Sequence, residues 1–592
     1  MHDPREVLQQ RLEQRRQTIG RLERVDARFA GARLAVFVAA AAAAGFAWWG
    51  RAISPWWVLV PAAAFLGLVV AHDRTLRALA RARRAATFHE DALARLDGTP
   101  PAAGPTGGGF AREDHPYAQD LDLFGERSVF HLLCTARTRP GEERLAAWLL
   151  APAPPAVARA RQRAVADLGP RLDLREDLAV LGEDIRAGVD AAALEAWGRA
   201  PRELGGRTAA LAAASAGASI AGAALWAAGA GPLPFLGAIA IAALVRRSMR
   251  HRLARVLDSL DRPSAELTLL SLVLGRLERE PFADAHLSAQ QARLREEAAP
   301  ASARIARLTG IAARVEWAKN QFFAPIAYLL QWTPLHAVAV ERWRAASGRA
   351  VGAWLDAVAE LEALSALAGY AHARPAHVFP EVVDLAPGAG PFLEADALRH
   401  PLLAGAIPND VRLGGAGPAA LLVSGSNMSG KSTYLRTVGV AAVLAQAGAP
   451  VPAARCRLTP LMPGATLRIQ DSLQAGRSRF YAEITRLRLL QDLARGPVPL
   501  LFLLDEILHG TNSHDRRIGA AALLETLVAA GAIGLVTTHD LALTELAGGR
   551  LANAHFEDQV QDGEIAFDYR LRSGVVAHSN ALALMRAVGL QV

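Results

Sequence analysis

The chain has 592 residues, with 65 basic and 57 acidic side chains and a formal net charge of +8. This length exceeds what one hydrophobic core serves and indicates roughly three or four domains, while the two cysteines, Cys134 and Cys456, exclude a disulfide framework and a thiolate zinc site. The excess of arginine suits an anionic partner, either DNA or lipid headgroups, or follows from a compositionally biased genome.

The N-terminal region predicts a membrane hairpin. Residues 1–33 read as an arginine- and glutamate-rich helix, and two uncharged segments follow, Leu34–Gly50 and Ala52–Ala71, separated by Arg51. Each segment is about long enough to span a bilayer. Tryptophans, which favour the membrane interface, gather where the chain would turn: Trp48, Trp49, Trp56 and Trp57. Residues 34–71 are therefore a predicted transmembrane hairpin.

A second uncharged block covers residues 208–245 and is broken at Gly229–Pro234. Eight arginines lie in residues 1–33, six in 74–95 and five in 246–255. By the positive-inside rule, both hairpins would leave their ends in the cytoplasm. The alternative is that these alanine-rich stretches are buried helices of a soluble protein.

The rest of the chain divides into three regions by composition and predicted secondary structure. Residues 72–115 predict a helix and a Pro/Gly-rich linker, 116–375 an all-helical core or lever domain, and 376–592 an α/β domain. Short apolar runs in the last region read as parallel strands between helices: Ala420–Ser424, Leu500–Leu504 and Gly534–Thr537. The predicted fold is multidomain, with a transmembrane hairpin, an all-α core and a C-terminal α/β domain.

A glycine-rich loop after the first of these runs fits the pattern G-x-x-x-x-G-K-[ST]. Its backbone N–H groups would surround nucleotide phosphates, with Lys431 at the β/γ-phosphates and the Ser432 hydroxyl on Mg²⁺. Only two lysines occur in the chain, Lys319 and Lys431, so a lysine is kept where a compact ammonium is needed. The candidate ATP-binding residues are Gly425, Ser426, Asn427, Met428, Ser429, Gly430, Lys431, Ser432 and Thr433.

The run at residues 500–504 ends in Asp505 and Glu506, the arrangement of a Walker B strand. Asp505 would hold Mg²⁺ through water, and Glu506 would orient or deprotonate the attacking water. A later strand ends in Thr537-Thr-His-Asp540, which places His539 where a γ-phosphate sensor would lie. Glu506, Lys431 and His539 are thus the candidate catalytic residues.

These motifs, in this order, resemble the MutS family of DNA mismatch-repair ATPases. The similarity rests on Gly-Ser-Asn-Met-Ser-Gly-Lys-Ser-Thr, Ser-x-Phe-x-x-Glu, Asp-Glu-Ile-x-x-Gly-Thr-Asn-Ser and Thr-His in residues 425–539. Similarity extends upstream to Arg399-His-Pro-Leu-Leu403, and more loosely to Asp120-Leu-Asp-Leu-Phe124 in the helical region. It covers residues 116–592 and is strongest over 395–590.

The resemblance implies an ABC-like P-loop ATPase in which two subunits sandwich ATP head to tail. Ser478, Phe480 and Glu483 would then form a signature that acts in trans, with Ser478 on the γ-phosphate bound by the partner. It also implies a homodimer whose helical levers clamp duplex DNA, with ATP binding closing the dimer and hydrolysis resetting it.

The sequence also departs from the family. Ser426 and Ser429 replace the usual proline and glycine, and Leu508-His509 replaces Gly-Arg. We expect no mismatch-reading wedge domain before the core, and neither a helix-turn-helix tail nor a nuclease domain after it. The predicted protein resembles a membrane-anchored subgroup of the family.

We therefore expect a MutS-like ATPase in the cytoplasmic membrane, with its ATPase domain facing the cytoplasm and its hairpins in membrane lipid. The alternative is an ABC-like mechanochemical ATPase of the membrane that no longer binds DNA. A transport ATPase fits less well, because two hairpins leave little room for a translocation path.

Overall fold

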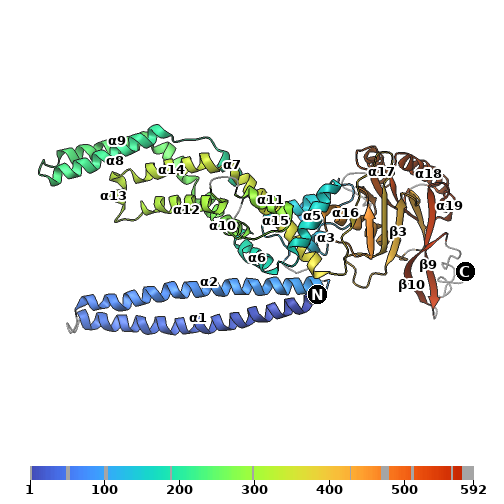
Figure 1. The fold of residues 1–592 in the computed structure, drawn as a ribbon, viewed down its shortest axis with the longest axis horizontal. Helices are drawn as coiled ribbons and strands as arrows, with labels where there is room; N and C mark the ends of the chain where they lie inside the picture. The colour runs from blue at the N-terminus through green and yellow to red at the C-terminus, as the bar shows by residue number, and fades with distance from the viewer. Residues whose placement is uncertain are drawn as a thin grey trace.

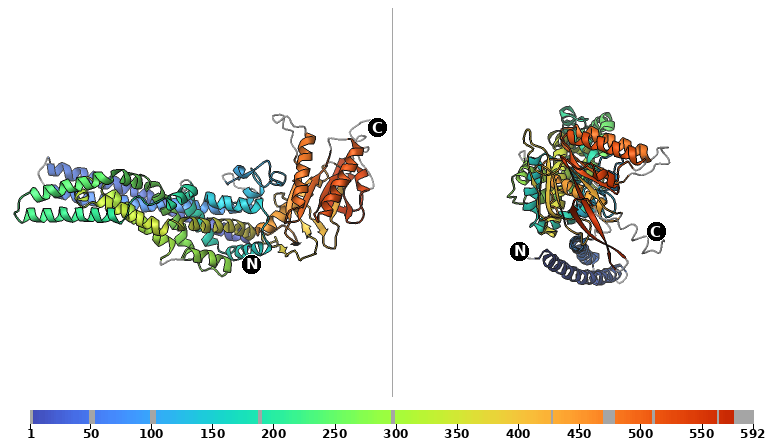
Figure 2. Two further views of the ribbon diagram at one scale, coloured as in Figure 1. Left: turned by 90° about the horizontal axis from the view of Figure 1, so that it is seen from above. Right: turned by 90° about the vertical axis from the view of Figure 1, so that its right-hand side faces the viewer.

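The computed structural model describes residues 3–48, 54–98, 104–186, 190–295, 299–426, 428–468, 479–508, 512–561 and 564–575. The molecule is elongated, with a helical region on one side and an α/β domain at the opposite end (Figure 1). Two helical hairpins extend away from the α/β domain, and their turns lie at the same end of the molecule (Figure 2).

The first hairpin consists of two long antiparallel helices, α1 (Pro4–Trp48) and α2 (Leu59–Leu96), with a short 3₁₀ turn, η1 (Pro55–Val58), before α2. The sequence divided α1 into a polar helix and a separate span, whereas the structure has one continuous helix. No proline interrupts the segment, and isolated glycines are tolerated inside a helix at a cost of about 1 kcal/mol each. The change from polar to apolar residues therefore does not break the helix.

The base of this hairpin is attached to the helical core. Leu8 and Phe88 pack with Leu172 and Ala179 of α6 (Leu172–Arg186). Next to this cluster, the buried Nε2 of His89 lies 2.8 Å from Glu176, whose other oxygen pairs with an arginine of α1. The base is thus fixed by both apolar and ionic contacts.

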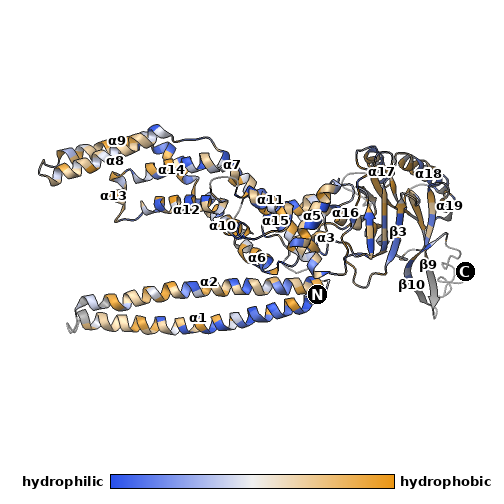
Figure 3. Cartoon of the chain, viewed as in Figure 1, coloured by the Kyte–Doolittle hydropathy of each residue, from blue (hydrophilic) through white to orange (hydrophobic). Residues whose placement is uncertain are grey.

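The half of the hairpin nearest the turn, unlike the base, does not pack against the core over its described residues. Its apolar side chains are exposed, and in Figure 3 this half is coloured hydrophobic while polar residues dominate α1 toward its base. By length and composition, α1, α2 and α8 (Gly206–Ala227) could each cross a membrane. The described apolar stretches of α1 and α2 contain no buried residues, whereas one third of the apolar stretch of α8 is buried. Large exposed apolar side chains of this half include Leu34, Phe37, Phe46, Trp56, Trp57, Leu59 and Leu66.

The second uncharged block also forms a hairpin, from α8 and α9 (Leu233–Asp258). The two helices approach closely at Gly222, where an added Cβ would lie 3.0 Å from the backbone of Phe235. Of this pair, only α8 meets the length and hydropathy of a membrane span in the described part of the chain. The reason is that α9 becomes basic from Arg246 onward.

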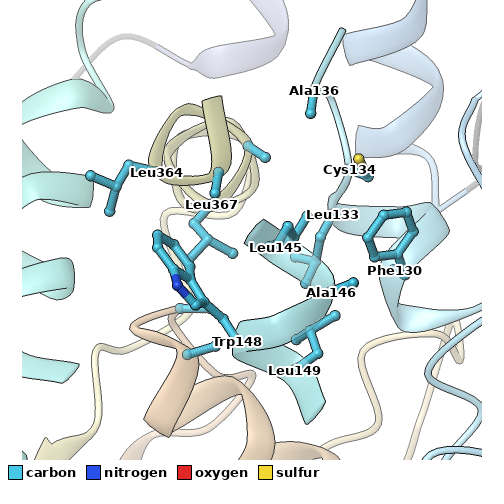
Figure 4. Packing of buried hydrophobic residues seen from close by; sticks show 14 of the residues in the cluster. Phe130, Leu133, Cys134, Ala136, Leu145, Ala146, Trp148, Leu149, Leu364 and Leu367 are labelled. Carbon is cyan, nitrogen blue, oxygen red and sulfur yellow. The ribbon is translucent and has the colours of Figure 1, made fainter. Parts of the chain in front are cut away.

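The helical core confirms the prediction of an all-α region. Its longest buried element is α15, in which most side chains are inaccessible because helices surround it on several sides. Figure 4 shows one such contact, where Trp148 of α4 lies near Leu367 of α15. The remaining helices are α3 (Val129–Leu133), α4 (Arg139–Leu150), α5 (Pro155–Leu168), α7 (Ala191–Arg199), α10 (Asp261–Leu277), α11 (Ala285–Arg293), α12 (Ala301–Trp317), α13 (Ala324–Leu329), α14 (Trp332–Ser347) and α15 (Ala350–Ala373), with a 3₁₀ turn η2 (Gly108–Phe110) before them.

The C-terminal domain contains two sheets. The smaller has the order β1-β5-β2-β3 and the larger the order β10-β9-β4-β8-β7-β6, in which all pairs are parallel except β9 with β10. The strands are β1 (Glu381–Val382), β2 (Phe392–Leu398), β3 (Asn409–Gly414), β4 (Ala420–Ser424), β5 (Arg455–Leu458), β6 (Met462–Thr466), β7 (Leu500–Asp505), β8 (Ile533–Thr538), β9 (Leu551–Gln561) and β10 (Glu564–Ser573). The three predicted strands are thus confirmed as β4, β7 and β8.

Helices cover both faces of the larger sheet, as the continuous apolar strands require. In β7, Leu501 and Leu503 pack in the cluster that contains α16, whereas Phe502 and Leu504 pack with α17 and α18. This alternation follows from the two-residue period of a strand. The helices of this domain are α16 (Lys431–Ala447), α17 (Arg479–Ala494), α18 (Ser513–Ala529) and α19 (Leu541–Thr544).

One buried carboxylate in the core predicts a pH effect on stability. Glu362 of α15 accepts hydrogen bonds from the backbone N–H groups of Arg137 and Thr138, at 3.2 Å each, and from the Thr138 hydroxyl. Burial nevertheless raises the pKa of Glu362 to about 7. The folded state therefore holds this proton more tightly than the unfolded chain, and stability falls as the pH rises from about 4.5 to 7.

We expect Glu362→Gln to remove this pH-dependent loss, which amounts to roughly 3 kcal/mol across the window. The measurement is the melting temperature of the purified protein against pH, relative to wild type. Glu143→Gln, on the exposed surface of α4, is the control. Parallel curves for wild type and Glu362→Gln would show that Glu362 does not titrate in this range.

Candidate functional site

The candidate site lies where three neighbouring parallel strands end. Strand β8 lies between β4 and β7, with Ser424 opposite Thr538 and Asp505 opposite Thr537. Because parallel strands end at the same edge, the loop after β4 and the acidic residues after β7 come together there. Ligand sites of open α/β sheets occur at this edge.

The loop after β4 requires unusual backbone angles. Gly425 has φ +150° and Gly430 has φ +101°, and Met428 also adopts a positive φ. At Gly425 an added Cβ would lie 2.9 Å from the Ser429 hydroxyl. Ser429 is buried and donates its hydroxyl to the Ser426 carbonyl at 2.8 Å, which closes the loop from inside. The serine at this position therefore takes part in holding the loop.

Lys431 begins α16 and folds back across the loop. Its ammonium donates to the carbonyls of Gly425 at 2.9 Å and Ser426 at 2.6 Å, and the residue is only 4% exposed. Ser432 and Thr433 follow in the first turn of α16, whose N-terminus carries partial positive charge. The arrangement gives a concave set of donors suited to an anion.

The acidic pair after β7 is held by β8. The Thr537 hydroxyl donates to Asp505, and the Glu506 backbone N–H donates to Thr537 at 3.1 Å. Glu506 adopts φ +48°, a strained angle for a residue with a side chain. This turn directs its carboxylate to His539, whose Nδ1 lies 3.5 Å away. The structure thus brings together Asp505, Glu506 and His539, and the catalytic roles assigned to Glu506 and His539 stay predictions.

Glu483 has a contact that the sequence did not suggest. It is buried on α17 and accepts a hydrogen bond from the Leu508 backbone N–H, in the turn after Glu506. Phe480 is partly buried and packs against the apolar cluster that β7 forms with α17 and α18. Glu483 therefore supports the acidic turn of its own chain, and the assignment of Ser478, Phe480 and Glu483 to a contact in trans stays a prediction. Ser478, Asn427 and residues 509–511 lie outside the described residues.

A pocket of about 540 Å³ opens beside the loop. Its lining includes Lys431, Ser432 and Glu506 on one side and residues 398–409 with Tyr569 on the other. The Tyr569 ring stands over the loop, 3.1 Å from the position of a Cβ on Gly430. A volume of this order fits a nucleotide-sized ligand.

Two further residues of this pocket were not singled out by their chemistry in the sequence. Tyr434 donates its hydroxyl to the Asp410 carbonyl at 2.8 Å, which joins α16 to β3. Burial, and then the positive charge of Arg436, lower the pKa of His400 to about 4, so its imidazole is neutral at pH 7. Neither the Tyr434–Asp410 hydrogen bond nor the proximity of Arg436 to His400 has a sequence signature, because the residues of each pair are far apart in the chain.

A buried ion pair joins the helical region to this site. Asp120 accepts hydrogen bonds from the backbone N–H groups of Leu467, at 2.7 Å, and Arg468, at 2.8 Å, just after β6. Its other oxygen accepts from Arg486 of α17 at 2.9 Å. Arg486 also donates to the His115 carbonyl at 2.6 Å. One carboxylate thus fixes both sides of the segment that contains Ser478.

The part of the chain that contains this site is similar to known proteins. Residues 421–591 match the model of MutS domain V. The chain is 35% identical over 209 residues to the DNA mismatch repair protein MutS of Thermus thermophilus, covering 34% of this chain and 25% of that protein. It is 37% identical over 246 residues to DNA mismatch repair protein MutS 2 of Halobacterium salinarum, covering 40% of this chain and 28% of the relative.

A third relative is Endonuclease MutS2 of Thermomicrobium roseum, with 38% identity over 213 residues, 34% of this chain and 26% of the relative. The fold and these matches define the class of the C-terminal part, a MutS-type domain V. Over this domain the chain is similar to proteins of the MutS family. The matched part spans about a quarter of the length of these relatives.

The Asp120 contact can be tested by Asp120→Asn. The amide oxygen can still accept from the backbone, but Arg486 loses the negative charge that compensates its burial. We expect a loss of about 3 kcal/mol, the usual cost of breaking a buried pair. Asp114→Asn, which removes an exposed partner of Arg112, is the matched control and should have no measurable effect. Thermal melting of both variants measures this, and equal melting temperatures would contradict it.

Proposed function

We propose that this chain is a MutS-like ATPase that binds and hydrolyses ATP with Mg²⁺ in a head-to-tail homodimer. The dimer would open and close a clamp on duplex DNA, and the hairpins would anchor it in the cytoplasmic membrane with the ATPase domain facing the cytoplasm. The observation that carries the proposal is the meeting of the Lys431 loop with Asp505 and Glu506 at one sheet edge.

The residues at this edge fit a magnesium nucleotide. The loop offers backbone N–H groups and the Lys431 ammonium to phosphates, as in an ABC-like P-loop domain. Ser432 and Asp505 would hold Mg²⁺, which supplies positive charge to the phosphate oxygens when bound. Among the described residues, no three His, Cys, Asp or Glu side chains gather into a metal site, so Mg²⁺ would be held jointly by these two side chains and the phosphates.

Hydrolysis would depend on the turn after β7. Glu506 would take a proton from the attacking water or orient it, and Thr537 holds the backbone that places its carboxylate. His539, beside Glu506, would contact the γ-phosphate. Ser478 of a second subunit would complete the site, so that contacts with the γ-phosphate favour the closed dimer.

Membrane anchoring is supported by the shape of the molecule. Both hairpins extend away from the α/β domain, and their exposed apolar parts lie at the far end (Figure 3). At the border of the first apolar part, Arg33 lies 3.0 Å from His72, which lies 2.6 Å from Asp26. Polar groups thus begin at the same level on both helices, as expected at a membrane surface.

DNA binding rests on the named function of the relatives, and a second function is favoured by the ion pairs of the core. Many core arginines pair with acidic residues of their own chain, including Arg144 with Asp356, Arg171 with Glu280, Arg276 with Asp177 and Arg344 with Glu341. These charges are compensated internally. This favours an alternative, an ABC-like mechanochemical ATPase of the membrane that no longer binds DNA.

The catalytic assignment predicts the behaviour of Glu506→Gln. We expect ATP binding to persist while kcat falls on the order of 10²-fold or more, because the general base is lost. The variant should also accumulate as a closed dimer with ATP. Glu545→Gln, at an exposed carboxylate after α19, is the control. Hydrolysis at the wild-type rate by Glu506→Gln would show that another group activates the water.

The DNA assignment predicts that duplex DNA stimulates steady-state ATP hydrolysis by the detergent-purified protein. The stimulation should weaken as salt rises, because phosphate contacts release counterions. Homoduplex and a duplex with one mismatch are compared, and an additional effect of the mismatch would show specific recognition. Activity that is indifferent to both duplexes would support the alternative function.

A further inference from the structure

The turn between α12 and α13 exposes large apolar side chains. Phe322 is 92% exposed, Trp317 55% and Ile326 50%. Such residues gathered on one short turn cost free energy in water and are typical of an interaction surface. We call residues 317–326 the aromatic turn.

The aromatic turn is joined to the second hairpin at a defined level. The buried Gln331 donates to the Ala242 carbonyl of α9 at 3.0 Å. One helical turn further, the Arg246 guanidinium lies over the Tyr328 ring at 5.2 Å. In α9 the uncharged stretch ends at Val245 and the arginines begin at Arg246. The aromatic turn therefore lies beside the border between the apolar and basic parts of α9.

The aromatic side chains here are ordered by their neighbours. The rings of Trp317 and Trp332 are stacked at 6.2 Å, and Phe323 meets Trp332 edge-on at 5.2 Å. The Trp332 indole N–H donates to the Arg314 carbonyl at 2.7 Å. Two tryptophans are thus fixed by their neighbours, and Trp317 lies two positions before the exposed Lys319, which pairs with Glu316. Rigid indoles near basic groups suit the interface of a bilayer.

We propose that the aromatic turn is a third membrane contact, inserting Phe322 and Ile326 among the lipids that surround the two hairpins. The occupant is a bilayer with anionic headgroups, because the apolar surface continues that of α9 and basic residues border it. The proposal rests on the membrane anchoring proposed above. It links the bilayer directly to α12 and α14, two helices of the core that are not part of either hairpin.

Lipid-dependent quenching tests this contact in the full-length protein. Bimane is attached to Phe322→Cys, to Leu236→Cys in the apolar part of α9, and to Glu545→Cys near the α/β domain. The native Cys134 and Cys456 are buried and react poorly. The proteins are reconstituted in nanodiscs that contain phosphatidylglycerol, with spin-labelled lipids as quenchers.

We expect loss of fluorescence at 322 and 236 but not at 545. Quenching at 236 with none at 322 would overturn the third contact while leaving the membrane anchor intact. No quenching at either position would overturn the insertion of the second hairpin and the third contact together. A signal at 322 that ignores lipid but shifts with protein concentration would assign the surface to a second copy of the chain, and would also overturn the proposal.

Discussion

The buried carboxylate of Asp120 connects the helical region with the strand-end chemistry. It binds two backbone N–H groups after β6 and the guanidinium of Arg486, so that three donors converge on one side chain. Such a pair is stable only while its geometry is kept, because either charge alone would be buried without compensation. The start of the core and α17 must therefore move together. A movement of the helical region would therefore be transmitted to the start of α17.

The acidic turn after β7 is also held by a few side chains that each bind more than one group or come from another element. Thr537 holds both Asp505 and the Glu506 backbone, while Glu483 holds the Leu508 backbone. The positive φ of Glu506 is maintained by these contacts from β8 and α17. Position at a strand end thus brings the carboxylates to the site, and hydrogen bonds from two other elements determine their direction.

Local patterns predicted much of this site. The apolar runs of β4, β7 and β8, and the glycines around Lys431, are recognisable because strand burial and loop conformation restrict residue type within a few positions. The Asp120 contact was out of reach, since Asp120 and Leu467 are 347 positions apart and an aspartate in a helical region has no distinctive pattern. The continuity of α1 was also missed, because a change in polarity looked like a boundary although the backbone had no reason to break.

The length of α1 has a geometric consequence. Its polar part, Pro4–Arg33, is about 45 Å long at 1.5 Å per residue, and its base is fixed to α6. In the proposed membrane-bound state this part contributes to the distance between the lipid surface and the α/β domain, which lies at the opposite end of the molecule (Figure 1). A partner bound between the bilayer and the α/β domain must fit within that distance. The number of helical turns in this part of α1 thus helps to set the distance of the α/β domain from the bilayer, whatever reaction the site performs.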